Sequence, residues 1–139
     1  MSVCIDHADL VRRFEAGDID PAAFRHAEHV HVAFGLLKKY DFLDATVIYA
    51  KGIRTLATKA GAPQKFNLTI TCAFMSLIAE RMAGNPCDDT ETFARDNPDL
   101  MSKTALAPLY ASDRLHSDIA RRVFLMPMPQ GGASPAGQV

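Results

Sequence analysis

Three of the five histidines lie within six residues of the sequence, at positions 26, 29 and 31 in the segment FRHAEHVHVAF. On a helix, with about 100° per residue, His26 and His29 are roughly 60° apart around the axis and one turn apart along it, so both can reach one ion or ligand. His31 is roughly 140° from His26 and points elsewhere. The spacing therefore predicts a site built on His26 and His29.

Neutral imidazole is a good ligand for zinc, copper, iron and nickel, but two histidines from one helical turn need further ligands from another element. The sequence offers six candidates for the third group: Asn67, Tyr40, Asp44, Cys72, His116 and Asp118. Cys72 is also expected to be a small buried residue. Packing is an alternative role for the pair, with one imidazole hydrogen-bonded between helices and the other in solvent.

The elements that must position these histidines are all predicted to be helices. Apolar residues recur at helical spacing, with glycine or proline where helices stop. The predicted helices span residues 6–16, 20–40, 43–60, 66–82, 91–95, 99–104 and 113–124. We expect a small all-α bundle of four main helices plus short helices, with the histidine pair on the second.

Two of these helices carry more specific expectations. The segment FNLTITCAFMSLIAERM, residues 66–82, reads as a strand at its start, but its length favours a helix, which we expect to be central in the bundle. The last helix is expected to begin at Ser112 as its cap. Its inward side is expected to consist of Leu115, Ile119, Ala120 and Val123.

Composition limits the class of protein. The 139 residues carry 15 basic and 16 acidic side chains, for a net charge of -1, which excludes a strong attraction for nucleic acid. We expect one helical domain over residues 1–125 and a flexible Pro/Gly-rich tail over 126–139. Three cysteines without a C-x-x-C pair, no signal-type start and no long apolar run predict a cytoplasmic protein without a membrane span.

Three stretches together resemble a family of short, mostly uncharacterised bacterial all-helical proteins: FEAGDIDPAAFRHAEHVHVAF, IYAKGIRTLATKAGAPQKFNLTITCAF and LYASDRLHSDIARRVFLMP. The family pattern is an F-x-H-x-x-H helix, a later aromatic-His-x-Thr-x-Thr element, and a Ser/Asp-x-x-Ala-Arg helix before a proline-containing segment. The resemblance covers residues 14–129. It implies a shared helical fold and a polar site between the second and fourth helices, without a settled reaction.

By this resemblance, His26 and His29 match the histidine pair, and Thr69 and Thr71 match the threonines of the second element. Asn67 stands where the family pattern has histidine. An amide oxygen is a weaker and harder ligand than imidazole. The resemblance therefore implies a metal site of His26, His29 and Asn67 that is weakened, altered in metal preference or lost.

The leading hypothesis is a metal-dependent enzyme acting on a small molecule. In it, His26 and His29 hold copper, iron or zinc, or act as acid–base groups. The alternative is a non-catalytic module that binds a small ligand or another protein without metal, and Asn67 favours it. A helix-turn-helix regulator is disfavoured because no basic recognition helix is present. Small bundles with apolar helices often form symmetric dimers, so a homodimer is also expected.

Overall fold

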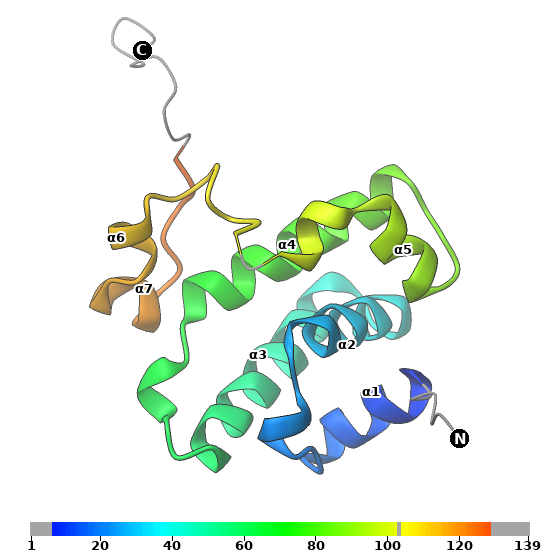
Figure 1. The fold of residues 1–139 in the computed structure, drawn as a ribbon, viewed down its shortest axis with the longest axis horizontal. Coiled ribbons are helices and arrows are strands. Elements are labelled where there is room, and N and C mark those ends of the chain that lie inside the picture. Colours follow the sequence, from blue (N-terminus) through cyan, green and yellow to red (C-terminus); the bar gives the residue numbers. More distant parts are fainter. Residues whose placement is uncertain (1–6, 103, 129–139) are drawn as a thin grey trace, which may run out of the picture.

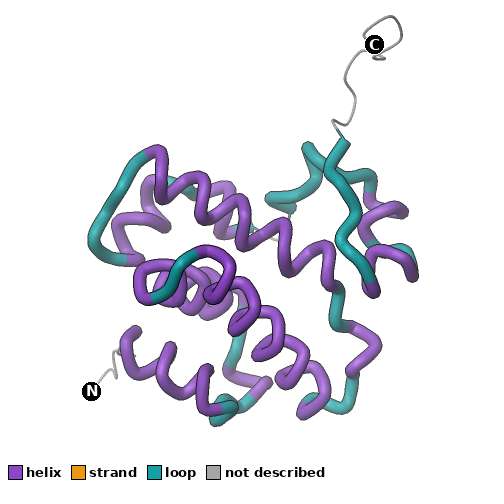
Figure 2. Tube along the Cα trace, turned by 180° about the vertical axis from the view of Figure 1, so that it is seen from behind, coloured by secondary structure: helices purple, strands orange, loops and turns teal. Residues whose placement is uncertain are grey.

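The computed structural model describes residues 7–102 and 104–128. Its four main helices are α1 (His7–Ala16), α2 (His26–Lys39), α3 (Phe42–Lys59) and α4 (Leu68–Gly84). Three shorter helices follow, and the described residues contain no strand (Figures 1 and 2). They are α5 (Thr90–Asp96), α6 (Ser112–Leu115) and α7 (Asp118–Arg122). The predicted all-α fold is confirmed.

The core is centred on α2. This helix contacts α1, α3, α4 and α5, whereas α4 contacts α2, α3 and α7 (Figure 1). The buried side chains of α2 are Val30, Val32, Ala33, Phe34 and Leu36. The prediction that α4 is the central helix was therefore wrong. α2 contacts all three other main helices, whereas α4 contacts two of them and α7 from the C-terminal part of the chain. None of the helices in the described ranges is long and apolar enough to cross a membrane.

Two glycines allow α1 to approach its neighbours closely. A Cβ at Gly52 of α3 would lie 2.2 Å from Phe14 Cζ, and one at Gly35 of α2 would lie 2.5 Å from Val11 Cγ2. Real Cβ atoms do not approach other atoms this closely, so any larger residue would push α1 outward. Gly52 therefore serves helix packing, although it weakens the intrinsic helix propensity of α3.

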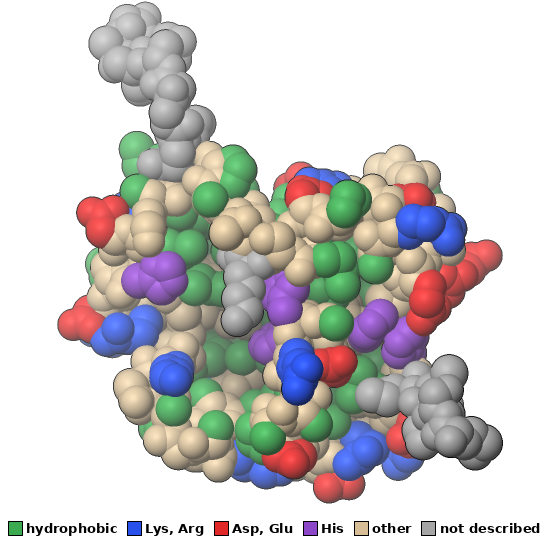
Figure 3. Space-filling model, in the orientation of Figure 1, with side chains coloured by type: hydrophobic (Ala, Val, Ile, Leu, Met, Phe, Trp, Pro, Cys, Tyr) green, Lys and Arg blue, Asp and Glu red, His purple; other side chains and the backbone are tan. Residues whose placement is uncertain are grey.

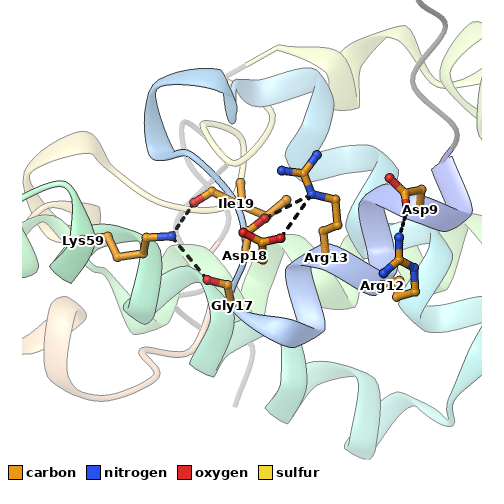
Figure 4. A network of polar contacts seen from close by, with 7 residues as sticks. All are labelled: Asp9, Arg12, Arg13, Gly17, Asp18, Ile19 and Lys59. Atoms are coloured by element: carbon orange, nitrogen blue, oxygen red, sulfur yellow. Dashed lines mark hydrogen bonds and ion pairs between the residues drawn. The ribbon is translucent and has the colours of Figure 1, made fainter.

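A polar network fixes the turn that follows α1 (Figure 4). Gly17 has a φ of +73°, a backbone conformation that glycine adopts without strain. Lys59 donates to the carbonyl oxygens of Gly17 at 3.3 Å and Ile19 at 2.8 Å, and Arg13 Nε donates to the Asp18 carbonyl oxygen at 3.2 Å. The end of α3 is thus tied to the loop that leads toward α2.

The predicted helix over residues 20–40 is interrupted before the histidine pair. The Asp20 side chain accepts the Ala22 N–H at 3.0 Å, but the helix it caps is a single 3₁₀ turn, Pro21–Ala23. Residues 24 and 25 are extended, and Phe24 packs against Phe14 with ring centroids 5.6 Å apart. This extended step buries Phe24 and makes His26 the first residue of α2.

The predicted helix over residues 113–124 is also interrupted, and it forms α6 and α7. The Ser117 hydroxyl donates to the Arg114 carbonyl oxygen and accepts the Ala120 N–H, so it caps α7 in place of the predicted cap at Ser112. Leu115 and Ala120 are buried as predicted, whereas Ile119 and Val123 are exposed. The prediction for these two was wrong because the break at residues 116–117 rotates the second half of the segment.

Most of the other predicted helices are present with shifted boundaries. The segment predicted as 66–82 is helical as α4, and the helix predicted at 99–104 is a 3₁₀ turn, Pro98–Met101. Residues 126–128, at the start of the predicted tail, are not helical. The Met126 carbonyl oxygen accepts a hydrogen bond from Arg114, and the Met128 N–H donates to the Leu109 carbonyl oxygen. The rest of the tail, residues 129–139, and residues 1–6 lie outside the described residues.

Candidate functional site

A cavity of about 1040 Å³ lies between α2, α3 and α4, and we call it the main cavity. It brings together His26, His29 and Asn67, the three residues predicted to form a site. Figure 3 shows several histidine side chains on one face of the molecule, interspersed with apolar side chains. Most of the cavity wall is apolar, and its apolar lining residues include Phe24, Ile53, Leu56, Phe66, Ile70 and Phe74.

His26 is held by a backbone carbonyl group. Its Nε2 lies 2.9 Å from the oxygen of Leu100, and its ring packs against Phe74 with centroids 5.4 Å apart. A carbonyl oxygen only accepts, so Nε2 must carry the proton in this bond. The tautomer of neutral His26 is therefore fixed, with Nδ1 as its basic nitrogen.

His29 is held by a buried tyrosine. Its Nδ1 lies 3.2 Å from the Tyr49 hydroxyl, and the Phe24 ring is 4.6 Å away between centroids. Burial raises the pKa of Tyr49 well above its usual value of 10, so its hydroxyl stays protonated. The His26 and His29 rings are 6.3 Å apart with an angle of 26° between their planes. The pair is thus presented by one helical turn and fixed by two neutral partners.

Asn67 lines the same cavity, but its amide group already makes two bonds. Its Oδ1 accepts the Ile70 N–H at 2.9 Å and so caps α4, while its Nδ2 donates to the Leu115 carbonyl oxygen at 2.8 Å. Asn67 is also only 8% exposed. Its contacts are those of a structural residue, which begins α4 and ties the C-terminal segment to it.

The two threonines of the same sequence element hold the chain in a similar way. The Thr69 hydroxyl donates to the Val123 carbonyl oxygen at 2.7 Å and accepts the Leu125 N–H at 3.0 Å. Thr71 donates back to the Asn67 carbonyl oxygen at 2.8 Å. Asn67 and Thr69 of this N-x-T-x-T segment therefore hold the C-terminal part of the chain against the start of α4. Asn67 and Thr71 also line the main cavity.

The described residues contain no group of three or more His, Cys, Asp and Glu side chains placed to hold a metal ion. Besides Asn67, His116 is the one candidate third ligand that lines the main cavity. Tyr40 instead donates to Glu15 at 2.6 Å, and burial raises the pKa of the half-buried Cys72 thiol. These residues do not complete a metal site, and the metal centre stays a prediction.

Three residues of the main cavity were not predicted from the sequence. Arg25 and Lys65 are exposed and add positive charge to its lining, and Tyr49 is buried beside His29. Arg25 directly precedes the histidine motif, which is a usable signal. Tyr49 and Lys65 carry no such signal, because only the packing of α3 and α4 against α2 brings them to the cavity.

A second cavity of about 480 Å³ lies between α1 and α2, and we call it the side cavity. His7 and His31 line it and stack with centroids 3.9 Å apart, and His7 Nδ1 lies 3.0 Å from a Glu91 carboxylate oxygen. Burial, followed by the nearby charge of His7, lowers the pKa of His31. His31 thus belongs to a contact between helices and not to the His26–His29 pair.

Searches against protein families, curated proteins and solved structures found no match for this chain. The resemblance to the family of short bacterial helical proteins therefore stays a prediction.

Proposed function

We propose that this protein binds a small organic molecule in the main cavity, with His26 and His29 as the polar contacts. The observation that carries this proposal is a cavity of about 1040 Å³ whose wall is mainly apolar and whose lining includes two neighbouring imidazoles. Sites for small molecules have this composition, with apolar walls for binding and a few fixed polar groups for orientation.

The fixed orientation of the histidines supports a binding role. The carbonyl oxygen of Leu100, a fully buried residue, holds His26, and the buried Tyr49 hydroxyl holds His29. Side chains that are already ordered lose little conformational entropy when a ligand arrives. Binding to this site therefore needs no large rearrangement of α2.

An NMR screen with neutral aromatic fragments tests the proposal. Fragments that bind should shift the imidazole signals of His26 and His29 and leave those of His7 and His31 unchanged. The variant Ala57→Phe fills part of the cavity wall and should abolish these shifts. Thr55→Phe changes an exposed residue of the same helix outside the lining and is the matched control. Binding that survives in Ala57→Phe, or fragments that shift only His7 and His31, would contradict the proposal.

Acid–base catalysis on the bound molecule is the second candidate, and the fixed tautomer of His26 favours it. Because Nε2 is held by Leu100, neutral His26 offers Nδ1 as a base. Fragments that bind would be incubated with the protein and followed by mass spectrometry. A product that disappears in His26→Gln, while binding persists, would assign catalysis to the site.

A further inference from the structure

The charge distribution in the main cavity is one-sided. Arg25 and Lys65 line it together with His26, His29 and His116, and no Asp or Glu of the described ranges does so. The side cavity differs, because two aspartates, at positions 88 and 89, are part of its wall. A concave surface that carries one sign of charge concentrates ligands of the opposite sign.

The acidic residue closest in sequence to the pair does not offset this charge inside the cavity. Glu28 is outside the lining, and its Oε1 accepts the Arg25 backbone N–H at 2.6 Å. Two long helices also begin at the cavity wall, since the cap residues of α2 and α4, Arg25 and Asn67, both line it. The start of a helix carries partial positive charge, which adds to the effect of the basic side chains.

The end of α3 also reaches the cavity, through Ala57 and Ala60, and a helix end carries partial negative charge. The carbonyl oxygens there are already bonded, because Ala57 accepts the Ala62 N–H at 2.9 Å and Leu56 accepts the Ala60 N–H at 2.9 Å. The end of α3 therefore repels an anion only weakly. The starts of α2 and α4 and the basic side chains attract it more strongly.

We propose that the main cavity selects an organic monoanion, namely a carboxylate on an aromatic or aliphatic body. This inference rests on the proposed function, since it names the class of molecule that the cavity takes. The apolar body lies against Phe24, Ile53 and Phe74, and the carboxylate lies toward Arg25 and Lys65. A phosphate uses several free N–H groups at a helix start, whereas at the start of α4 the Asn67 side chain already accepts the Ile70 N–H.

Calorimetric titration with matched pairs of compounds tests the inference. The probes are benzoate, 2-naphthoate, biphenyl-4-carboxylate and octanoate, each beside its primary amide, at neutral pH and low salt. The pairs differ in charge and keep the same body. We expect at least one carboxylate to bind about tenfold more tightly than its amide, as expected for ion pairs in a partly exposed site. Added salt should reduce this preference.

The variant Arg25→Gln/Lys65→Gln should bring the carboxylate to within about threefold of its amide, since it removes the lysine and the arginine of the described lining. The control Lys51→Gln/Arg54→Gln removes the same charge from exposed positions outside the lining and should keep the preference. Equal affinity of carboxylates and amides in the unchanged protein would overturn the inference and leave the proposed function intact. If no member of any pair bound, both would fail.

Discussion

The two histidine pairs of this molecule differ in how they are assembled. His26 and His29 come from one turn of α2, and each is held by a neutral partner at the wall of the main cavity. His7 and His31 come from α1 and α2, stack on each other, and have a carboxylate beside them. The first pair is presented to a space large enough for a ligand, and the second closes a contact between two helices.

This difference shows that the number and spacing of histidines do not by themselves identify a site. His31 is only two residues from His29 in the sequence, but it lines the side cavity, whereas His29 lines the main cavity. What separates the pairs is the space around them and the charge of the partner. If the surroundings set the roles, substitutions near the main-cavity pair and near the side-cavity pair should have different effects.

The largest effect is expected at the partner of His26. Leu100 is fully buried, and its carbonyl oxygen holds the His26 ring. Leu100→Ala should lower the free energy of unfolding by about 2–5 kcal/mol, because the lost side chain leaves a cavity in the core. Leu43→Ala, at a leucine that is 71% exposed, is the control and should change stability by less than about 0.5 kcal/mol in urea titrations. An equal loss of unfolding free energy in both variants would show that the Leu100 side chain, whose carbonyl oxygen bonds His26, is not packed in the core.

Next is Asn67, whose two bonds can be separated by two substitutions. Asn67→Ala removes the cap of α4 and leaves the Leu115 carbonyl oxygen without its donor, which should cost about 2–4 kcal/mol. Asn67→Ser keeps a good helix cap but is too short to reach Leu115, so it should lose about half as much. Unfolding curves of the two variants measure the difference. A neutral effect of Asn67→Ala would contradict the structural role and reopen a ligand role for Asn67.

The contact between α1 and α2, which includes His7 and His31, should be sensitive to side-chain size at Gly35. Gly35→Ala places a Cβ against Val11 and should destabilise the protein by about 1–3 kcal/mol. Gly84→Ala is the matched control, because nothing lies within 4 Å of its added Cβ, and the substitution should be neutral or stabilising. Thermal unfolding of both variants tests how tightly α1 packs on α2. Similar melting temperatures for the two variants would argue against close packing of α1 on α2 at Gly35.

The main-cavity pair itself should matter little for stability. His26→Ala/His29→Ala removes two hydrogen bonds and should cost about 1–2 kcal/mol, leaving the protein folded. Metal analysis of the unchanged protein and this variant also tests the metal hypothesis. Near-stoichiometric metal that is lost in the folded variant would establish a metal site and contradict a role limited to organic ligands. An unfolded variant would place the pair with the structural contacts.

The smallest effect is expected from the titration of His31. Its pKa in the folded protein is lowered below the ordinary value of 6.5, so the unfolded chain binds more protons in this range. Stability from this group is therefore present above pH 6.5 and is lost as the pH falls below it. His31→Phe keeps a ring against His7 and removes the titration, so its unfolding free energy should depend less on pH between 7.5 and 5.0. An unchanged pH dependence would contradict this.

Helical periodicity along the chain is sufficient to predict the all-α class and the position of His26 and His29 on one side of a helix. The periodicity of residues 43–60 and 66–82 predicts α3 and α4 to within two residues at each end. The three-residue spacing of His26 and His29 predicts that both point to one side of a helix, because it depends only on the geometry of that helix, whereas the cavity beside them is formed by the packing of α3 and α4 against α2. Both residues belong to the first turn of α2, and an arrangement within a single turn can be predicted from the sequence without knowing how the helices pack.

The helix breaks and the residues that surround each cavity depend on packing between segments far apart in the sequence. The helix breaks at residues 24–25 and 116–117 lie beside Phe24 and Leu115, which are both buried against other parts of the chain. The same packing brings Lys65 and Tyr49 to the main cavity and His7 onto His31. These contacts join residues from different helices, and their partners are chosen by how apolar faces fit together, which a pattern along one segment does not contain.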